Sequence, residues 1–376
     1  MPTRVILTRC PDYAGVAAAL PRLLDALGGM GAFVKPGQSV LIKPNMLTDA
    51  LPDEAVTTHP EVVRAVIRLV QAAGANPWVA DSPANVADLP KVWERTGIQA
   101  VCREEQVPLV NLEKGGSERF VVEGVEFTIA NSVLEADAII TVPKVKTHLL
   151  TGLTGAVKNL YGVVPGLQKT SLHKRYPRTD DFSRMLVMVF RRVKPVLAIA
   201  DGVVGMEGNG PSAGVPVPMG FLAASADGVA LDTVLCRTLG LDVRTVLHLQ
   251  EAHRAGLGEV DPARIVVEGD GQAALAPRPY RLPDTVPTHL IPRWAVRLVK
   301  PLIWHRPDFT ARCVFCGQCV KACPVGALRI ERGQRPVLTP SVCIACCCCH
   351  EICPARAIEM RASPLVRLIG RLRARR

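Results

Sequence analysis

Ten of the thirteen cysteines lie between Cys313 and Cys353, in two stretches that share one spacing. The first reads CVFCGQCVKACP from residue 313, and the second reads CIACCCCHEICP from residue 343. Both fit C-x2-C-x2-C-x3-C-P, in which three thiolates enclose one face of an iron–sulfur cubane and the fourth ligates the neighbouring cluster. The spacing therefore predicts two [4Fe–4S] clusters with crossed ligands.

The crossed arrangement divides eight cysteines into two quartets. A zinc site of four cysteines is the alternative, but the repeated third cysteine and the trailing proline do not follow the zinc-ribbon pattern. Two cysteines fall between the predicted ligands. We interpret Cys347 and Cys348 as small apolar fillers, with redox activity or exchange into the cluster as the alternative. The first quartet is Cys313, Cys316, Cys319 and Cys353, and the second quartet is Cys343, Cys346, Cys349 and Cys323.

Composition and cysteine placement together limit the class of protein. Of the 376 residues, 48% are hydrophobic and 21% are charged, so the chain is able to bury a core and we do not expect disorder. No run of eighteen apolar residues predicts a transmembrane helix, and the N-terminus lacks a long apolar signal region. Locally crowded cysteines without a secretion signal indicate metal in a reducing compartment. We therefore expect a cytoplasmic protein, with a membrane-peripheral location as the alternative.

The rest of the chain predicts a second, larger domain. Short apolar stretches such as RVILTR and ADAIITVPK alternate with amphipathic stretches such as PEVVRAVIRLVQAAGA. This alternation predicts an α/β fold, a largely parallel (mixed) sheet covered by helices, followed by a small α+β ferredoxin-like domain. The predicted units are residues 1–285 (α/β domain), 286–310 (basic amphipathic linker), 311–362 (ferredoxin-like domain with two [4Fe–4S] clusters) and 363–376 (basic amphipathic tail).

Polar residues gather where the predicted strands end, in LIKPN, VADSP and residues 142–166. Parallel sheets bind ligands at the carboxyl ends of their strands. A lysine- and threonine-rich loop that opens a helix suits an anion, phosphate or carboxylate. For any single residue, a turn or a solvated loop is the alternative interpretation. The candidates for substrate binding are Lys43, Asn45, Asp81, Ser82, Lys144, Thr147, Thr154, Lys158 and Asn159.

Four further residues are candidates for catalysis. His148 lies beside two lysines at a predicted strand end, a suitable place for a general acid or base. Carboxylates in IADGVVGMEGNGPSAG are suited to acid–base chemistry or to holding a cation. The catalytic candidates are Lys146, His148, Asp201 and Glu207.

Taken together, these motifs resemble the DUF362 family, a domain of unassigned function. The resemblance spans residues 5–270 and rests on LIKPN, THPEVV, ADSP, VPKVKTH, TGAVKNLYG, ADGVVGMEGNGP and DGVALD. Members often carry a C-terminal ferredoxin module, and the family is more distantly similar to the N-terminal domain of the nickel-pincer lactate racemase. The resemblance implies an α/β fold, motifs clustered into one site, and small carboxylate or cofactor chemistry. It does not imply a reaction, because fold does not fix function.

The net charge of +11 belongs to the C-terminal quarter. Residues 286–376 hold sixteen Lys and Arg against four Asp and Glu. Linker and tail combine basic residues with apolar stripes, as helices on anionic membrane surfaces do. For the linker we favour packing on the protein, whereas for the tail packing and peripheral membrane contact are both open. Nucleic acid is not an expected partner, because only 4% of residues are aromatic and no nucleic-acid module is visible.

The leading hypothesis from the sequence is an iron–sulfur oxidoreductase, in which the fused module carries single electrons to or from an anionic site in the large domain. Its expected partners are a soluble electron donor or acceptor protein and an unknown anionic small molecule. One alternative is a non-catalytic electron carrier that docks a partner protein through the large domain. Another is a redox-inert racemase- or hydratase-like enzyme whose clusters are structural or serve sensing.

Overall fold

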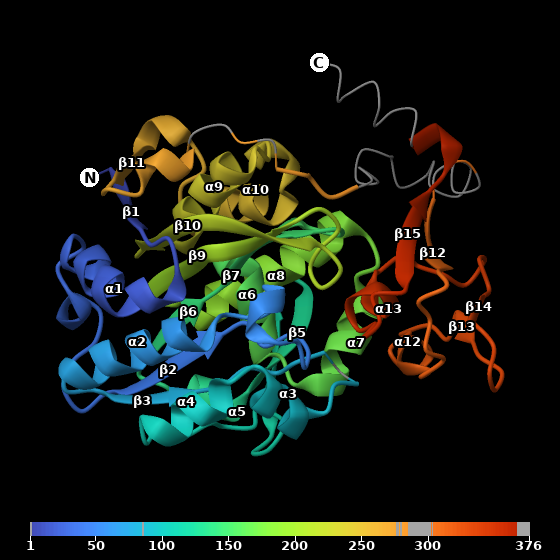
Figure 1. Cartoon of the computed structure of the whole chain (residues 1–376), viewed down its shortest axis with the longest axis horizontal. Coiled ribbons are helices and arrows are strands. Elements are labelled where there is room, and N and C mark those ends of the chain that lie inside the picture. Colours follow the sequence, from blue (N-terminus) through green and yellow to red (C-terminus); the bar gives the residue numbers. More distant parts are fainter. Residues whose placement is uncertain are drawn as a thin grey trace.

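The computed structural model describes residues 2–84, 86–275, 278, 280–284, 302 and 304–366. In this part of the chain, nine strands form one mixed sheet in the order β11-β1-β10-β9-β6-β2-β3, with β7 beside β9 and β8 beside β7 (Figure 1). The strands are β1 (Thr3–Arg9), β2 (Ser39–Pro44), β3 (Asn76–Val79), β6 (Ala138–Val142), β7 (Lys144–His148), β8 (Gly152–Thr154), β9 (Leu197–Glu207), β10 (Val215–Ser225) and β11 (Ile265–Glu268). A separate hairpin joins β4 (Ser117–Val122) to β5 (Val125–Ala130).

Most of the strand pairs in the large sheet are parallel. β2 runs parallel to β3 and β6, β9 runs parallel to β6 and β7, and β1 runs parallel to β11. β10 is antiparallel to β1 and β9, and β7 is antiparallel to β8. The expected largely parallel, mixed sheet is therefore confirmed. Residues 144–148, which the sequence assigns to a loop, instead form the buried strand β7.

Alternating side chains of the sheet enter two different hydrophobic cores. Leu41 belongs to one core, whereas its neighbours Val40 and Ile42 belong to the other. Because successive side chains of a strand point to opposite faces, helices must cover both sides. One face is covered by α1 (Val16–Asp25), α2 (Pro60–Ala72), α3 (Leu89–Arg95) and α4 (Ile98–Glu104). The other is covered by α5 (Asn131–Leu134), α6 (Ala156–Asn159), α7 (Gly166–Arg175), α8 (Thr179–Val193), α9 (Gly228–Leu239) and α10 (Leu247–Arg254).

The C-terminal module contains two copies of one cysteine loop, displaced by thirty positions. Each loop leads into a short helix, α12 (Gln318–Lys321) or α13 (Cys348–Glu351). The backbones match closely: φ is 72° at Gly317 and 65° at Cys347, its counterpart. Antiparallel pairs β12 (His305–Phe309) with β15 (Ile358–Ala362), and β13 (Leu328–Arg329) with β14 (Val337–Leu338), complete the module.

β12 lies within residues 286–310, which the sequence assigns to the linker. Its pairing with β15 makes residues 305–309 part of the module, because a strand is stable only beside a hydrogen-bonded partner. The rest of the predicted basic linker, apart from residues 302, 304 and 310, lies outside the described residues, as does most of the predicted tail. Within the described ranges, no helix is long and apolar enough to cross a membrane.

The second cysteine loop packs against the large domain through α13 (Figure 1). Leu149, which follows β7, belongs to the hydrophobic core of the module. His350 Nε2 lies 3.0 Å from the carbonyl oxygen of Asn209, and Arg356 Nη2 donates to Glu54 Oε1 at 2.6 Å. Val314, in the first loop, is 60% exposed. The two repeats therefore have different surroundings despite similar backbones.

We predict that Gly202→Ala destabilises the sheet. A Cβ at Gly202 would lie 2.6 Å from the buried ring of Phe221, its cross-strand neighbour. Overpacking of this kind costs about 1–3 kcal/mol of unfolding free energy, measurable by urea denaturation under anaerobic conditions. Gly31→Ala is the matched control, since a Cβ there meets nothing within 4 Å. Equal stability of the two variants would contradict the prediction.

Candidate functional site

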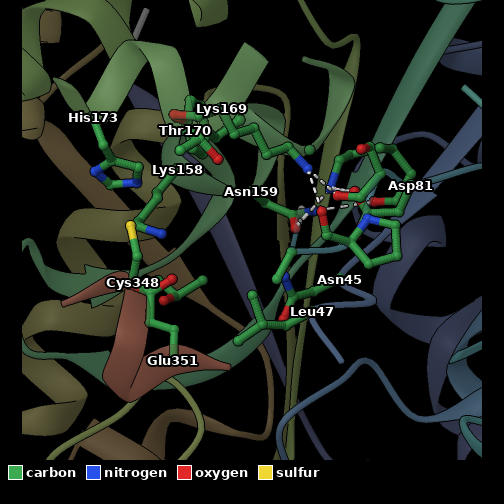
Figure 2. Close-up of a pocket in the computed structure, with 17 residues that line it drawn as sticks. Asn45, Leu47, Asp81, Lys158, Asn159, Lys169, Thr170, His173, Cys348 and Glu351 are labelled. Atoms are coloured by element: carbon green, nitrogen blue, oxygen red, sulfur yellow. Dashed lines mark hydrogen bonds and ion pairs between the residues drawn. The ribbon is translucent and has the colours of Figure 1, made fainter. Parts of the chain in front are cut away.

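A cavity of about 80 Å³ lies at the carboxyl ends of β2 and β3, where α13 faces the large domain (Figure 2). It has room for several water molecules or one small anion. The sequence predicted seven of its lining residues: Lys43, Asn45, Asp81, Ser82, Thr154, Lys158 and Asn159. The lining also includes Gly162, Lys169, Thr170, His173, Cys348 and Glu351.

A buried ion pair forms one end of the cavity. Lys43 Nζ lies 2.8 Å from Asp81 Oδ1, and both side chains are almost completely buried. Lys43 Nζ also donates to Asn159 Oδ1 at 3.0 Å, and the amide of Met46 donates to Asp81 Oδ2 at 2.6 Å. Burial lowers the pKa of Lys43, and the Asp81 carboxylate partly restores it. This network joins the ends of β2 and β3 to α6.

The ion pair requires a glycine beside it. A Cβ at Gly162 would lie 1.8 Å from Asp81 Oδ1 and 2.6 Å from Lys43 Nζ. The amide of Ser82 donates to the carbonyl oxygen of Gly162 at 2.9 Å, which fixes the same close approach. The last glycine of TGAVKNLYG is therefore explained by the space that the charged pair occupies.

Two more lysines reach the cavity. Within the described part of the chain, Lys158 Nζ makes no hydrogen bond or ion pair, and burial lowers its pKa. Lys169 Nζ donates to the carbonyl oxygens of Ser82 and Pro83. Burial lowers the pKa of Lys169 to about 7. The cavity thus holds amine groups whose charge a bound anion would stabilise.

Other polar atoms at the cavity also lack partners. Thr154 Oγ1 and Asn45 Oδ1 are buried and have no hydrogen-bond partner within the described residues. Thr154 itself is only 2% exposed. Buried polar atoms are normally paired, so unpaired ones that line a cavity indicate a place for a ligand.

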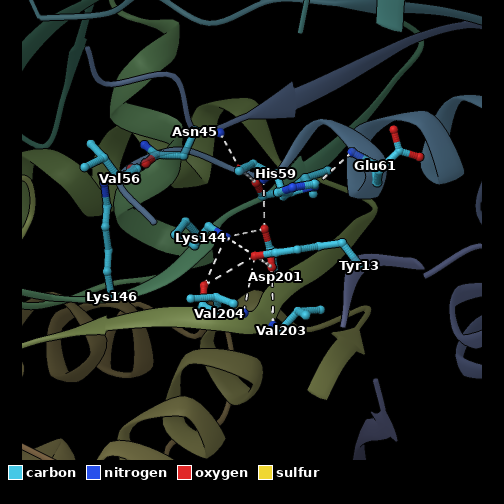
Figure 3. Close-up of polar contacts among 12 residues, drawn as sticks. Tyr13, Asn45, Val56, His59, Glu61, Lys144, Lys146, Asp201, Val203 and Val204 are labelled. Carbon is cyan, nitrogen blue, oxygen red and sulfur yellow. Dashed lines mark hydrogen bonds and ion pairs between the residues drawn. The ribbon is translucent and has the colours of Figure 1, made fainter. Parts of the chain in front are cut away.

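A second polar cluster contains two other predicted residues, but it is closed (Figure 3). Lys144 Nζ lies 2.5 Å from Asp201 Oδ2 and donates to the Tyr13 hydroxyl at 2.8 Å. The amide of His59 donates to Asp201 Oδ2 at 2.9 Å, and the His59 ring stacks on Tyr13. All these hydrogen bonds are made within the protein, so this cluster ties β7 and β9 to the start of α2. The proposed catalytic role of Asp201 remains a prediction.

The remaining predicted residues are also outside the cavity lining. Lys146 Nζ donates to the carbonyl oxygen of Val56 at 2.5 Å, and burial lowers its pKa well below the usual value. Thr147 Oγ1 donates to the carbonyl oxygen of Gly208 at 2.7 Å. Glu207 Oε1 accepts from Arg281 Nε at 2.7 Å. None of these three residues lines the cavity, although Lys146 lies near enough to Lys158 for the two amines to repel each other.

His148 connects the large domain to the module. Its Nδ1 accepts from the amide of Leu150 at 3.0 Å, so the ring proton of the neutral form is on Nε2. That Nε2 lies 3.2 Å from Glu351 Oε1. Burial lowers the pKa of His148 to about 3, which keeps the ring neutral. His148 therefore helps to position Glu351 at the cavity.

Sequence reasoning missed the residues that α7 and α13 bring to the cavity. Lys169 and His173 are four residues apart on α7, and this spacing places them on one helical face. Such a pair is a detectable signal, although it lies outside the motifs that carry the family resemblance. Cys348 and Glu351 belong to the cysteine-rich stretch, and no local pattern indicates that they face another domain.

The two predicted quartets line two separate cavities. One, of about 20 Å³, is lined by Cys313, Cys316, Cys319 and Cys353 among its residues. The other, of about 20 Å³, is lined by Cys323, Cys343, Cys346 and Cys349 among its residues. The cysteines of the chain form no disulfides. The four predicted ligands around each cavity fit a [4Fe–4S] cluster, and Cys347 is a fifth cysteine in the lining of the second cavity.

Backbone amides add a second feature that fits such a group. The amides of Ala327 and Ala357 donate to the sulfurs of Cys323 and Cys353, each at 3.2 Å. Hydrogen bonds to the sulfurs are among the factors that set the potential of an iron–sulfur cluster. Cys323 and Cys353 are the fourth cysteines of their stretches. Each of the two predicted crossed ligands therefore accepts an equivalent backbone hydrogen bond.

The fold and these cysteine loops define an α/β protein fused to an iron–sulfur module. The model of the family described as "Domain of unknown function (DUF362)" matches residues 40–237, and that of the 4Fe-4S binding domain matches residues 309–329. The chain therefore belongs to the DUF362 family. The match and the clustered cysteines support at least one [4Fe–4S] cluster, and the chain is an iron–sulfur electron-transfer protein.

Individual relatives match different parts of the chain. "Thylakoid-associated protein sll1697" from Synechocystis sp. is 39% identical over 259 residues, 67% of this chain and 79% of the relative. "NADH-quinone oxidoreductase subunit I" from Escherichia coli (strain K12) is 36% identical over 64 residues, 17% of this chain and 34% of the relative. Among solved structures, the lactate racemase apoprotein from Thermoanaerobacterium thermosaccharolyticum matches with a TM-score of 0.41 and 14% identity, covering 60% of this chain and 55% of that one.

We predict that removing the charge of either Lys43 or Asp81 destabilises the folded protein. Lys43→Met or Asp81→Asn should each lower the unfolding free energy by about 3–5 kcal/mol, because each leaves a buried charge without its partner. The double variant should lose less than the sum of the two single losses, as measured by urea denaturation. Additive losses would show that the two groups do not interact.

Lys169 should make stability depend on pH. Its folded pKa of about 7 lies below the unfolded value of 10.5, so between these values the unfolded state binds more protons. The unfolding free energy therefore rises with pH in this window, by at most about 1.4 kcal/mol per pH unit. Lys169→Met removes this contribution. Urea denaturation of both proteins from pH 7 to pH 10 measures the difference, and parallel pH profiles would contradict the assignment.

Proposed function

We propose that this protein is an iron–sulfur oxidoreductase that transfers single electrons between its module and a small anion bound in the cavity at α13. The observation that carries the proposal is the shared wall of that cavity. Lys43, Lys158 and Lys169 come from the large domain, whereas Cys348 and Glu351 come from the second cysteine loop. A carrier fused to its acceptor acts at a high effective concentration.

The lining residues have distinct roles in this proposal. Lys158 and Lys169 bind the anion, and the hydroxyl of Thr154 donates a hydrogen bond to it. Lys43 is a weaker candidate for direct binding, since Asp81 already neutralises it. Asn45 offers an acceptor oxygen that orients a donor group of the ligand. Burial of these groups strengthens each interaction, because charges attract more strongly in a low-dielectric site.

The proposal includes two [4Fe–4S] clusters, held by the first and second quartets with crossed ligands. When bound, such clusters supply or accept single electrons. The grouping of the cysteines around two cavities supports this count. Three members of the second quartet lie in the loop that reaches the anion cavity, so this quartet is the one that exchanges electrons with the ligand.

The first quartet is the proposed contact for a soluble electron donor or acceptor. Its loop exposes Val314 by 60% and Phe315 by 45%, and Cys316 is also exposed. Arg312 and Lys321 flank this surface with positive charge. A partner protein whose interface has an apolar centre and acidic residues around it would therefore be complementary to this surface.

A peripheral membrane location is a further part of the proposal. The relative from Synechocystis is named thylakoid-associated, and the predicted tail at residues 363–376 holds five arginines and no acidic residue. Basic segments are attracted to anionic lipid surfaces. Such a contact would place the module near membrane-bound redox proteins.

The function is tested by reoxidation of the reduced protein. The protein is purified without oxygen, reduced, and followed by visible absorbance while a small-molecule fraction of cell extract is added. We expect rapid reoxidation of the wild type and a rate lower by about tenfold or more in Lys158→Ala, because a charge-assisted contact is lost. Thr154→Val should act in the same direction.

Lys114→Ala is the matched control, since it removes an exposed lysine of the large domain. It should reoxidise at the wild-type rate. If only protein fractions reoxidise the wild type, and Lys158→Ala behaves identically, the chain is an electron carrier and not a reductase. Turnover of a carboxylate substrate without any electron donor would instead indicate a redox-inert enzyme.

A further inference from the structure

Cys348 is the one residue of the second cysteine loop that both contacts a predicted cluster ligand and lines the anion cavity. It directly precedes Cys349 in the chain and lies two residues after Cys346, and both of these cysteines are members of the second quartet. It lines the cavity together with Lys158 and Glu351 (Figure 2). Cys347, which is 2% exposed, packs beside predicted ligands in the core of the module but does not line the anion cavity.

The first repeat shows that the loop itself does not require these two cysteines. Gly317 and Gln318 stand at the positions of Cys347 and Cys348, with the same backbone conformation at the first of the two. In the first repeat these two residues are half-buried, and neither lines the anion cavity. In the second repeat this part of the loop faces the large domain, so the side chain at position 348 reaches a ligand site.

The cavity beside Cys348 has independent features of a ligand site. Thr154 Oγ1 is buried and has no partner within the described residues. Lys158 Nζ has no hydrogen-bond or ion-pair partner there either. Lys158 is close enough to Cys348 for the two groups to interact electrostatically. A small anion between Lys158 and Cys348 would therefore meet a cation, a hydroxyl donor and a thiol.

We propose that Cys348 is a ligand-contacting residue of the cavity, which takes a small carboxylate or phosphate between Lys158 Nζ and Cys348 Sγ. This proposal rests on the function proposed above and adds the residue that joins the ligand to the second quartet. Because Cys348 is bonded through the backbone to Cys349, a member of that quartet, the path from the ligand to the quartet is short.

Anionic and neutral alkylating reagents test this geometry in the intact protein. Iodoacetate and iodoacetamide react by the same step: the sulfur displaces iodide, an S–C bond replaces the C–I bond, and the thiol proton goes to the buffer. The ratio of their rates at one pH cancels the reactivity of the thiol itself. It therefore reports how strongly the surroundings of the thiol attract a carboxylate.

The expected result is selective labelling of Cys348 in the anaerobically purified protein with its clusters intact, identified by mass spectrometry. The iodoacetate-to-iodoacetamide ratio should exceed that of glutathione in the same buffer by about tenfold. Inorganic phosphate and acetate are the competing probes. Slower labelling with phosphate alone indicates a phosphate ligand, and slower labelling with acetate indicates a carboxylate ligand; either supports the proposal.

Variants test whether the raised iodoacetate-to-iodoacetamide rate ratio is caused by the residues of this cavity. Lys158→Ala should return the ratio to that of glutathione, whereas Lys158→Arg should keep it high. Lys114→Ala, which removes an exposed lysine of the large domain, is the control for a general loss of positive charge and should change nothing. Cys348→Ser should abolish labelling while visible absorbance shows that the clusters are retained.

Two results would overturn the proposal. One is a ratio equal to that of glutathione and unaffected by Lys158→Ala, or no labelling of Cys348 at all. The other is a Cys348→Ser variant that keeps both wild-type reoxidation and its dependence on Lys158. The second result would leave the proposed oxidoreductase function standing and remove only Cys348 from it.

Discussion

The buried ion pair between Lys43 and Asp81 is the interaction on which the candidate site depends. Neither charge has access to bulk water, so each must be neutralised and hydrogen-bonded by fixed partners. Those partners come from the ends of β2 and β3 and from α6. The pair therefore sets the spacing of these elements, requires glycine at position 162, and leaves Lys158 and Lys169 to face the cavity.

Two polar clusters built from similar residues have different properties because their hydrogen bonds are used differently. Lys144 and Asp201 satisfy each other and are completed by Tyr13 and His59, so nothing remains for a ligand. At the cavity, Thr154 retains an unused hydroxyl group. The first arrangement holds strands together, and the second is suited to binding. Residue type alone does not distinguish the two.

The two cysteine repeats show how one backbone serves two purposes. Their conformations agree at equivalent positions, yet the second repeat makes polar contacts with the large domain, such as His350 with Asn209, whereas Val314 and Phe315 of the first repeat are exposed. Because of this asymmetry, one loop is exposed to solvent and the other lines the cavity. An electron carrier placed in this way has one side for a partner protein and one side for a ligand.

The sequence by itself determined the features that depend on local pattern. Apolar alternation predicted the α/β sheet, spacing predicted the cysteine loops, and strand-end motifs predicted Lys43, Asp81, Thr154 and Lys158 as site residues. Only the tertiary structure decided which buried polar groups have hydrogen-bond partners. It also decided which part of the module packs on the large domain. Cys348 and Glu351 reach the cavity through the docking of α13, a contact between residues about 200 positions apart in the chain. Such contacts depend on three-dimensional packing, which no local spacing encodes.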